Sequence, residues 1–161
     1  VTLAERYGGN SVSRPVYADM VAEVAAGLEP FDRRHGIGER VAGGRVQMLG
    51  TSGTVTTLAG VQMELPRYDR SRVDGSWLSF DDALAISDRL RSMSCDDRAA
   101  HPCIGNERAD LVVAGCAILE AICRTWPVGR LRVADRGIRE GLLQGLVRAA
   151  DREAWAGHRS R

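Results

Sequence analysis

The sequence predicts an α/β domain in which a short, mostly parallel sheet is covered by helices. Short apolar segments, typical of strands, alternate with longer segments whose apolar residues recur at helical spacing. Such alternation favours parallel pairing, because each helix returns the chain to the same end of the sheet. The length of 161 residues fits one domain, and a content of 44% hydrophobic and 27% charged residues is enough for a buried core.

Three short, largely apolar segments are expected to form strands of one sheet. They are Val1–Tyr7, Arg45–Leu49 and Arg130–Ala134. The first is followed by the turn-forming run Gly8-Gly9-Asn10, and glycines interrupt the second sharply at residues 50–54. These boundaries set the positions at which helices can begin.

Helices are predicted where a capping residue precedes a helical pattern. Ser13 is an expected N-cap of a helix that runs to about Phe31, and Ser79 caps another whose first turn is acidic. Further helices are expected over residues 54–63, 107–126 and 136–150, with 94–106 as a loop and 151–161 as a frayed polar tail. The segment 107–126 is apolar nearly all round, which predicts a helix at the centre of the domain.

Composition excludes several classes of function. The 22 basic residues are all Arg, so a Walker-type phosphate loop and every Schiff-base chemistry are excluded, because both need Lys. A net charge of +1 gives no reason to expect nucleic acid as a partner. The longest strongly apolar stretch, Leu111–Leu119, is far too short to cross a membrane. The four cysteines lack zinc-site spacing and are expected to be reduced thiols of a cytoplasmic protein.

The best local signal for function is the glycine-rich loop between the second strand and the next helix. Glycines let a ligand approach the backbone, and the helix that follows presents free amides and a positive dipole end to an anion. Hydroxyl side chains in the loop add donors. The candidate phosphate- or nucleotide-binding residues are Gly50, Thr51, Ser52, Gly53 and Thr54. A tight strand-to-helix turn with N-capping hydroxyls explains the same residues, so both interpretations stay open.

A second candidate lies at the end of the third strand, where Asp135 leads into the last helix. Carboxyl ends of strands border the ligand cleft in open α/β sheets, so both loops are expected to face one cleft. Asp135 could position a metal-bound water or cap the helix. Arg67 and Arg108 are candidate phosphate clamps, or members of structural ion pairs. No catalytic residue and no protein metal ligand is identified.

Three blocks of sequence together resemble the exopolyphosphatase / guanosine pentaphosphate phosphatase (Ppx/GppA) family. They are LGTSGTVTTLAGVQMELPRYDRSRVDG (Leu49–Gly75), NERADLVVAGCAILEAI (Asn106–Ile122) and LRVADRGIREGLL (Leu131–Leu143). The resemblance implies a ribonuclease-H-like fold of the actin, sugar-kinase and Hsp70 ATPase superfamily. It places residues 1–150 in the later half of the family's second domain, so the earlier half and the first domain are expected to precede this chain.

The resemblance also implies an activity. The whole protein would cleave the terminal phosphoanhydride bond of inorganic polyphosphate or guanosine pentaphosphate with Mg²⁺, and a homodimer is one expected assembly. Residues 50–54 would contact phosphate or nucleotide, with Arg67 and Asp135 as further contacts. A non-catalytic phosphate- or nucleotide-sensing module with the same fold is the alternative, and a sugar-kinase-like phosphotransferase is a third. The chain differs from the family at Asp74, where histidine is usual, and at Ala134, where serine is usual.

Overall fold

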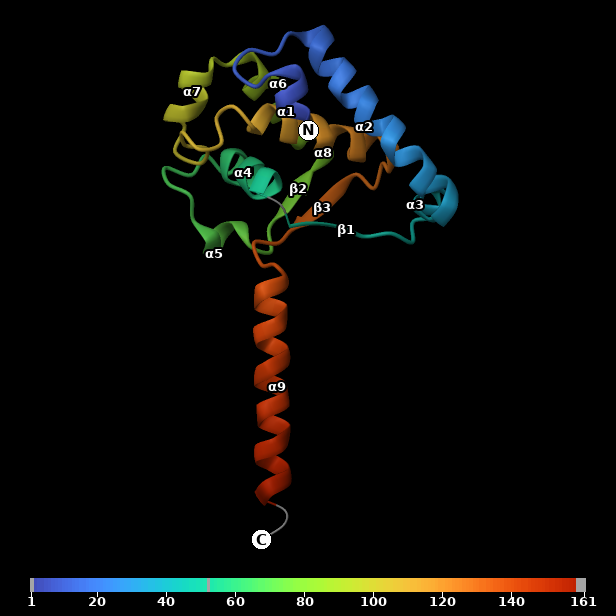
Figure 1. The fold of residues 1–161 in the computed structure, drawn as a ribbon, viewed down its shortest axis with the longest axis vertical. Helices are drawn as coiled ribbons and strands as arrows, with labels where there is room; N and C mark the ends of the chain where they lie inside the picture. The colour runs from blue at the N-terminus through green and yellow to red at the C-terminus, as the bar shows by residue number, and fades with distance from the viewer. Residues whose placement is uncertain (1, 52, 159–161) are drawn as a thin grey trace.

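The structure is a computed structural model that describes residues 2–51 and 53–158. A body of helices packs above a small sheet, and one long helix, α9, projects away from it (Figure 1). The described helices are α1 (Leu3–Tyr7), α2 (Arg14–His35), α3 (Ile37–Ala42), α4 (Gly53–Gln62), α5 (Arg70–Val73), α6 (Phe80–Ser92), α7 (Cys95–Ala100), α8 (Val112–Thr125) and α9 (Ile138–His158). The described strands are β1 (Met48–Gly50), β2 (Trp77–Ser79) and β3 (Arg130–Val133).

The sheet has the order β1-β3-β2 and is mixed. β1 pairs with β3 in parallel, with Gly50 opposite Val133, whereas β2 pairs with β3 in antiparallel, with Leu78 opposite Leu131. The expectation of a mostly parallel sheet therefore holds for one of the two strand pairs. β2 was not predicted, because three residues are too few to show the alternation of apolar and polar side chains that marks a strand. It forms only by pairing with β3, which lies far along the chain.

The prediction of a strand at the start of the chain was wrong. Residues Leu3–Tyr7 form the short helix α1. The cause is a capping box, in which the Thr2 side chain accepts the Glu5 N–H while the Glu5 carboxylate accepts the Thr2 N–H. This reciprocal pair satisfies two amides that a helix start otherwise leaves free, and it outweighs the β-like composition of the segment.

Helix α8 occupies the centre of the body, as expected from its apolar character. It packs against α2, α4 and α6, and Val113, Cys116 and Ala121 on it are fully buried. The helix begins at Val112 instead of at residue 107. The Ala109 carbonyl accepts a hydrogen bond from the Arg98 side chain at 2.7 Å, so it does not begin a helical ladder.

The caps predicted at Ser13 and Ser79 are confirmed. The Ser13 hydroxyl accepts the Val16 N–H, and the Ser79 hydroxyl accepts the Asp82 N–H. The segment expected to be a loop over 94–106 contains α7, which Ser94 caps in the same way. A helix of six residues is too short for its apolar spacing to be recognised.

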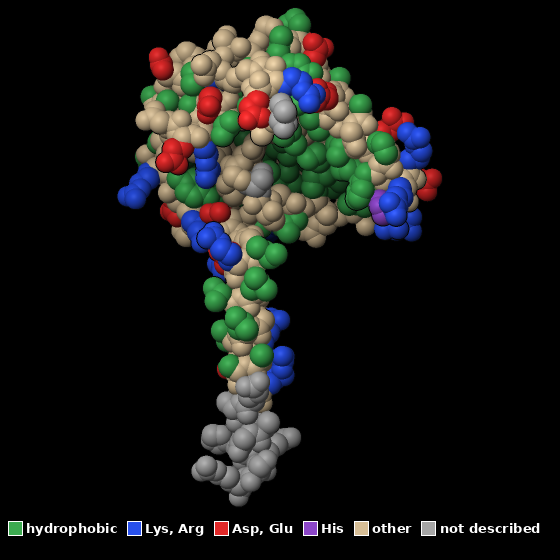
Figure 2. Space-filling view, in the orientation of Figure 1, with side chains coloured by type: hydrophobic (Ala, Val, Ile, Leu, Met, Phe, Trp, Pro, Cys, Tyr) green, Lys and Arg blue, Asp and Glu red, His purple; other side chains and the backbone are tan. Residues whose placement is uncertain are grey.

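Helix α9 begins at Ile138 and continues to His158, so the helix extends beyond the expected end at Ala150. Residues 151–156 contain neither glycine nor proline, which leaves nothing in the sequence to stop the helix there. Figure 2 shows hydrophobic side chains along α9 and in a hollow on the same face of the body. In the part of the chain that the structure describes, no helix combines the length and the hydrophobicity that a membrane crossing requires.

Candidate functional site

The two candidate loops lie side by side at the carboxyl edge of the parallel pair β1–β3. Gly50 ends β1 opposite Val133, and its carbonyl accepts the Ala134 N–H at 2.8 Å. The loop that leads into α4 therefore starts next to Asp135, and the expectation that both loops face one ligand cleft stays a prediction. Ser52, another predicted site residue, lies outside the described residues.

Arg108 faces the N-terminal turn of α4. Its Nη1 donates to the Thr57 hydroxyl at 3.3 Å, and a Cβ built on Gly53 would lie 3.4 Å from the same nitrogen. Arg108 is exposed, and this bond occupies one of its five N–H donors. Gly53, Thr54, Thr57 and Arg108 border a hollow of about 230 Å³. A helix start, two hydroxyls and a guanidinium together are suited to bind an anion.

Gly50 has a different neighbourhood. A Cβ at this position would lie 2.8 Å from Val55 Cγ1 and 3.2 Å from Leu131 Cδ1. Both Gly50 and Gly53 have φ values outside the left-handed region. Gly50 is therefore required by the packing of α4 on the sheet, and its role is independent of any ligand.

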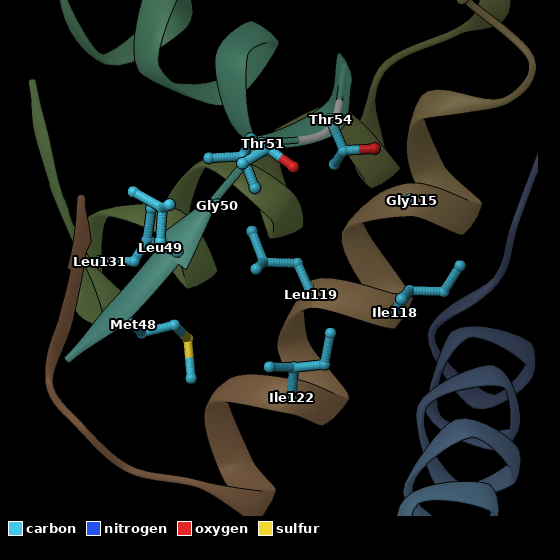
Figure 3. Close-up of a pocket in the computed structure, with 11 residues that line it drawn as sticks. Met48, Leu49, Gly50, Thr51, Thr54, Gly115, Ile118, Leu119, Ile122 and Leu131 are labelled. Carbon is cyan, nitrogen blue, oxygen red and sulfur yellow. The ribbon is translucent and has the colours of Figure 1, made fainter. Parts of the chain in front are cut away.

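A second and larger cavity, of about 380 Å³, lies between β1 and α8. Figure 3 shows Met48, Leu119 and Ile122 on opposite walls of it, with Thr51 and Thr54 at one end. Its lining is almost entirely apolar, so it does not suit a phosphate. Thr54 closes this end by packing on α8, where a Cβ on Gly115 would lie 2.2 Å from the Thr54 hydroxyl oxygen.

Asp135 belongs to a polar cluster between β3 and α9. Its Oδ2 accepts the Tyr68 hydroxyl proton at 2.7 Å and lies 3.5 Å from Arg70 Nε. Its backbone N–H donates at 3.0 Å to Asp74, which also accepts from Arg136 at 2.7 Å. Asp74 thus holds the backbone at the end of β3.

The first turn of α9 is capped by Glu140, which accepts the Gly137 N–H at 2.8 Å. Asp135 makes no such bond among the described contacts. The Gly137 N–H and then the Arg70 guanidinium lower the pKa of Glu140 to about 2. Burial, followed by the hydrogen bond to Asp135, raises the pKa of Tyr68 to about 12, while the positive charge of Arg108 acts in the opposite direction. Tyr68 therefore stays a proton donor at neutral pH. It is close enough to feel the charges of both Asp135 and Arg108.

Arg67 is exposed and has no hydrogen bond or ion pair with the described residues. The neighbouring Tyr68 and Arg70 make the contacts to Asp135 instead. Both residues, and Thr57, were missed as site residues. The spacing offered a signal for Thr57, because residues four apart in a helix share a face and Thr57 follows Gly53 at that distance.

The described residues do not fit a magnesium ion by themselves. No group of three or more His, Cys, Asp or Glu side chains among them is arranged to hold a metal. At this edge of the sheet, the carboxylates of Asp135, Asp74 and Glu140 are all engaged by arginine side chains. These carboxylates are therefore already paired and are not free to bind Mg²⁺.

Comparison with known proteins decides the family. Residues 4–150 match the sequence profile described as the Ppx/GppA phosphatase family. The chain belongs to this family. A curated relative, Exopolyphosphatase 2 of Mycobacterium tuberculosis (strain CDC 1551 / Oshkosh), is 28% identical over 103 residues, which make up 62% of this chain and 32% of the relative. The chain thus spans about a third of the length of the curated relatives it matches.

Solved structures show the same fold. The crystal structure of the Aquifex aeolicus Ppx/GppA family member superposes with a TM-score of 0.76 at 20% identity, covering 92% of this chain and 46% of that chain. An exopolyphosphatase-like protein gives a TM-score of 0.76 at 26% identity, covering 92% and 48% of the two chains. The α/β, ribonuclease-H-like fold of the actin-like superfamily is therefore confirmed, with this chain as a partial domain.

Proposed function

We propose that this chain forms part of a phosphohydrolase that cleaves the terminal phosphoanhydride bond of inorganic polyphosphate or guanosine pentaphosphate. Membership of a phosphatase family supports this proposal. The observation that carries it is the position of Arg108 across the N-terminal turn of α4, beside Gly53 and Thr57. Phosphoryl transfer depends mainly on positioning and on neutralising negative charge, and this arrangement supplies both.

Each part of the hollow has a role in binding. The amides and dipole of the first turn of α4 attract a terminal phosphate. Thr54 and Thr57 line the hollow, and the buried Thr57 hydroxyl bonds Arg108. Arg108 has free N–H groups in a planar fork that matches two phosphate oxygens. Nη1 of this fork also donates to the Thr57 hydroxyl at the helix start, at 3.3 Å.

We expect this chain alone to bind phosphate chains without hydrolysing them. The side chains that line the Arg108 hollow are Thr54, Thr57, Arg108, Leu111 and Val112, and none of them is a carboxylate that could activate water. A general base for the reaction would therefore come from a segment other than these lining residues. The Mg²⁺ that the family resemblance implies stays a prediction for the whole protein.

The test is calorimetric titration of this chain with tripolyphosphate. Charge-assisted hydrogen bonds contribute about 1.5–3 kcal/mol, so Arg108→Ala should weaken binding by roughly tenfold or more. Arg34→Ala is the matched control, because it removes the same charge from an exposed position on α2, away from the site. Equal losses in both variants would reduce the effect to net charge and overturn the proposed site.

A phosphate- or nucleotide-sensing module remains the alternative function. The same titration with guanosine pentaphosphate distinguishes the two substrates, and phosphate release by the whole protein distinguishes an enzyme from a sensor. Tight binding without phosphate release by the whole protein would favour the sensor.

We also propose that the protein works in the cytoplasm. All four cysteines are free, and three of them, Cys103, Cys116 and Cys123, are buried. Burial raises the pKa of Cys116 to about 11 and that of Cys123 to about 12, so both thiols stay protonated and unreactive. Such thiols are typical of proteins from a reducing compartment.

A further inference from the structure

Arg98 is a fully buried charged side chain with an unusual set of partners. It projects from α7 with no exposed surface, and its guanidinium donates only to backbone carbonyls. Nε donates to Ala109 at 2.7 Å, Nη1 to Leu90 at 3.2 Å and Met93 at 2.7 Å, and Nη2 to Gly9 at 2.6 Å and Asn10 at 2.9 Å. All five of its N–H groups are therefore used.

These bonds join three segments that are distant in the sequence. Leu90 and Met93 stand at the end of α6, where the negative end of the helix dipole offsets the buried positive charge. Gly9 and Asn10 belong to the loop after α1, and Ala109 belongs to the loop that enters α8. Figure 1 shows α7, in yellow, beside that last loop.

The Ala109 bond fixes the backbone one residue after Arg108. Gly9, itself held by Arg98, packs so closely on the same loop that a Cβ there would lie 1.8 Å from the Asp110 carbonyl oxygen. The Arg108 side chain, by contrast, is held by one long bond to Thr57, at 3.3 Å. The point at which Arg108 leaves the backbone is therefore held by its own turn bonds to Gly105 and Val112 and, through the next residue, by Arg98.

We propose that Arg98 is a positioning residue that keeps Arg108 over the N-terminal turn of α4 and so sets the affinity of the site for phosphate chains. The inference rests on the proposed function. It assigns to Arg98 a role that acts through Arg108 and involves no contact with the ligand.

The test is a double-mutant cycle with tripolyphosphate as the probe. Arg98→Lys keeps the charge but has three donors and no planar fork, so it cannot hold all five carbonyls. We expect it to weaken tripolyphosphate binding by about tenfold. In an Arg108→Ala background the same substitution should cause no further loss, because the residue through which it acts is already absent. Arg14→Lys, an equal change at an exposed ion pair with Asp88, is the control and should leave affinity unchanged.

The possible outcomes are distinct. A lower melting temperature with unchanged affinity would make Arg98 a purely structural residue and overturn the inference. An equal loss of affinity in both backgrounds would also overturn it. Failure of the unsubstituted chain, in folded form, to bind tripolyphosphate would overturn the proposed function and this inference with it.

A second variant decides the question if Arg98→Lys does not fold. Gly9→Ala displaces the Asp110 carbonyl and leaves the Arg98 side chain unsubstituted. The same loss of affinity, again absent in the Arg108→Ala background, is expected from it. Unchanged binding by a folded Gly9→Ala chain would contradict the proposed link.

Discussion

Gly50 ends β1 and Gly53 begins α4, three positions later, but the space around them differs. A methyl group on Gly50 would collide with Val55 and Leu131, whereas the atoms nearest to one on Gly53 belong to the Arg108 guanidinium, at 3.4–3.7 Å. Gly50→Ala should therefore lower the free energy of unfolding by about 1–3 kcal/mol, as overpacking does. Gly53→Ala should leave stability nearly unchanged and weaken tripolyphosphate binding. Urea denaturation and calorimetric titration measure the two effects separately.

Gly27 provides the control for this pair. It lies inside α2, where an added Cβ has no neighbour within 4 Å. Gly27→Ala should raise the free energy of unfolding by about 0.5–1 kcal/mol, because it removes backbone freedom from the unfolded chain. If Gly53→Ala destabilised the chain as much as Gly50→Ala, the loop would be a structural turn only.

All three tyrosines should titrate above their ordinary pKa near 10. The hydrogen bond to Glu23 raises the pKa of Tyr7, and burial raises the pKa of both Tyr17 and Tyr68, that of Tyr68 to about 12. Because the folded chain holds these protons more tightly than the unfolded chain, the stabilisation is complete below pH 10 and is lost as pH rises toward 12. Ultraviolet absorbance of tyrosinate should thus stay low in the native chain at a pH where the urea-unfolded chain is ionised. Matching titration curves for the two states would contradict the buried placement of Tyr17 and the partly buried placement of Tyr68.

The side chains of the candidate site were only partly predictable. The glycine-rich loop and Arg108 could be found because their chemistry is visible in a short motif. Tyr68 and Arg98 could not, because a tyrosine and an arginine acquire their roles from partners about 67 and 89 positions away. Arg67 was predicted as a site residue in place of Tyr68, because a charged residue suggests phosphate binding and a tyrosine gives no sign of its hydrogen-bond partner.

The stability of the first turn of α9 should depend on pH through Glu140, which belongs to the polar cluster at the end of β3. The Glu140 carboxylate accepts the Gly137 N–H and pairs with Arg70, and these contacts lower its pKa from 4.5 to about 2. A carboxyl group whose pKa is lowered by folding stabilises the folded state at every pH above its ordinary pKa. This stabilisation is lost as the pH falls to the lowered pKa of the folded state. Amide exchange at Gly137 and Gly141 should accelerate as pH falls from 4.5 toward 2, after correction for the intrinsic rate.

Glu140→Gln is the control for this pH dependence. The amide side chain can still accept the Gly137 N–H but has no charge to titrate, so protection at the start of α9 should become independent of pH in this range. A variant that keeps the full pH dependence would place its origin in another group, with Asp74 the first candidate, since its pairing with Arg136 lowers its pKa as well.

The two helices with predicted serine caps share a property. α2 and α6 have a serine cap followed by several turns of amphipathic pattern, so local chemistry and burial agree. α1 failed because its capping box was overlooked in favour of β-like composition, although the spacing of Thr2 and Glu5 was visible. β2 failed for a different reason, since its three residues form a strand only through pairing with β3.

The whole chain leaves much apolar surface uncovered. The cavity beside β1 opens on one face, and Leu49 on that edge strand is 60% exposed. Figure 2 shows this hollow and the apolar side chains of α9 on one side of the molecule. Exposed apolar surface on this scale is typical of an interaction site, which fits a chain that covers less than half of the solved relatives.

We therefore expect the chain to self-associate in solution, with a homodimer as the simplest product. Five large apolar side chains of α9 are 59–80% exposed: Ile138, Leu142, Leu143, Leu146 and Val147. Burying each against a second copy removes apolar area from water at about 25 cal/mol per Å², which favours association as concentration rises. Sedimentation equilibrium should show this dependence.

Charged substitutions on the apolar face of α9 test whether this face joins the two copies. Leu142 and Leu146 are four residues apart and share a face of the helix, so Leu142→Glu with Leu146→Glu places two carboxylates in the expected contact and should shift the chain to monomer. Gln144→Glu adds charge to the other side of the same helix and should leave association unchanged. If the unsubstituted chain stays monomeric at every concentration, α9 does not join two copies. If Gln144→Glu dissociates the oligomer as well, the cause is net charge and not burial of this face.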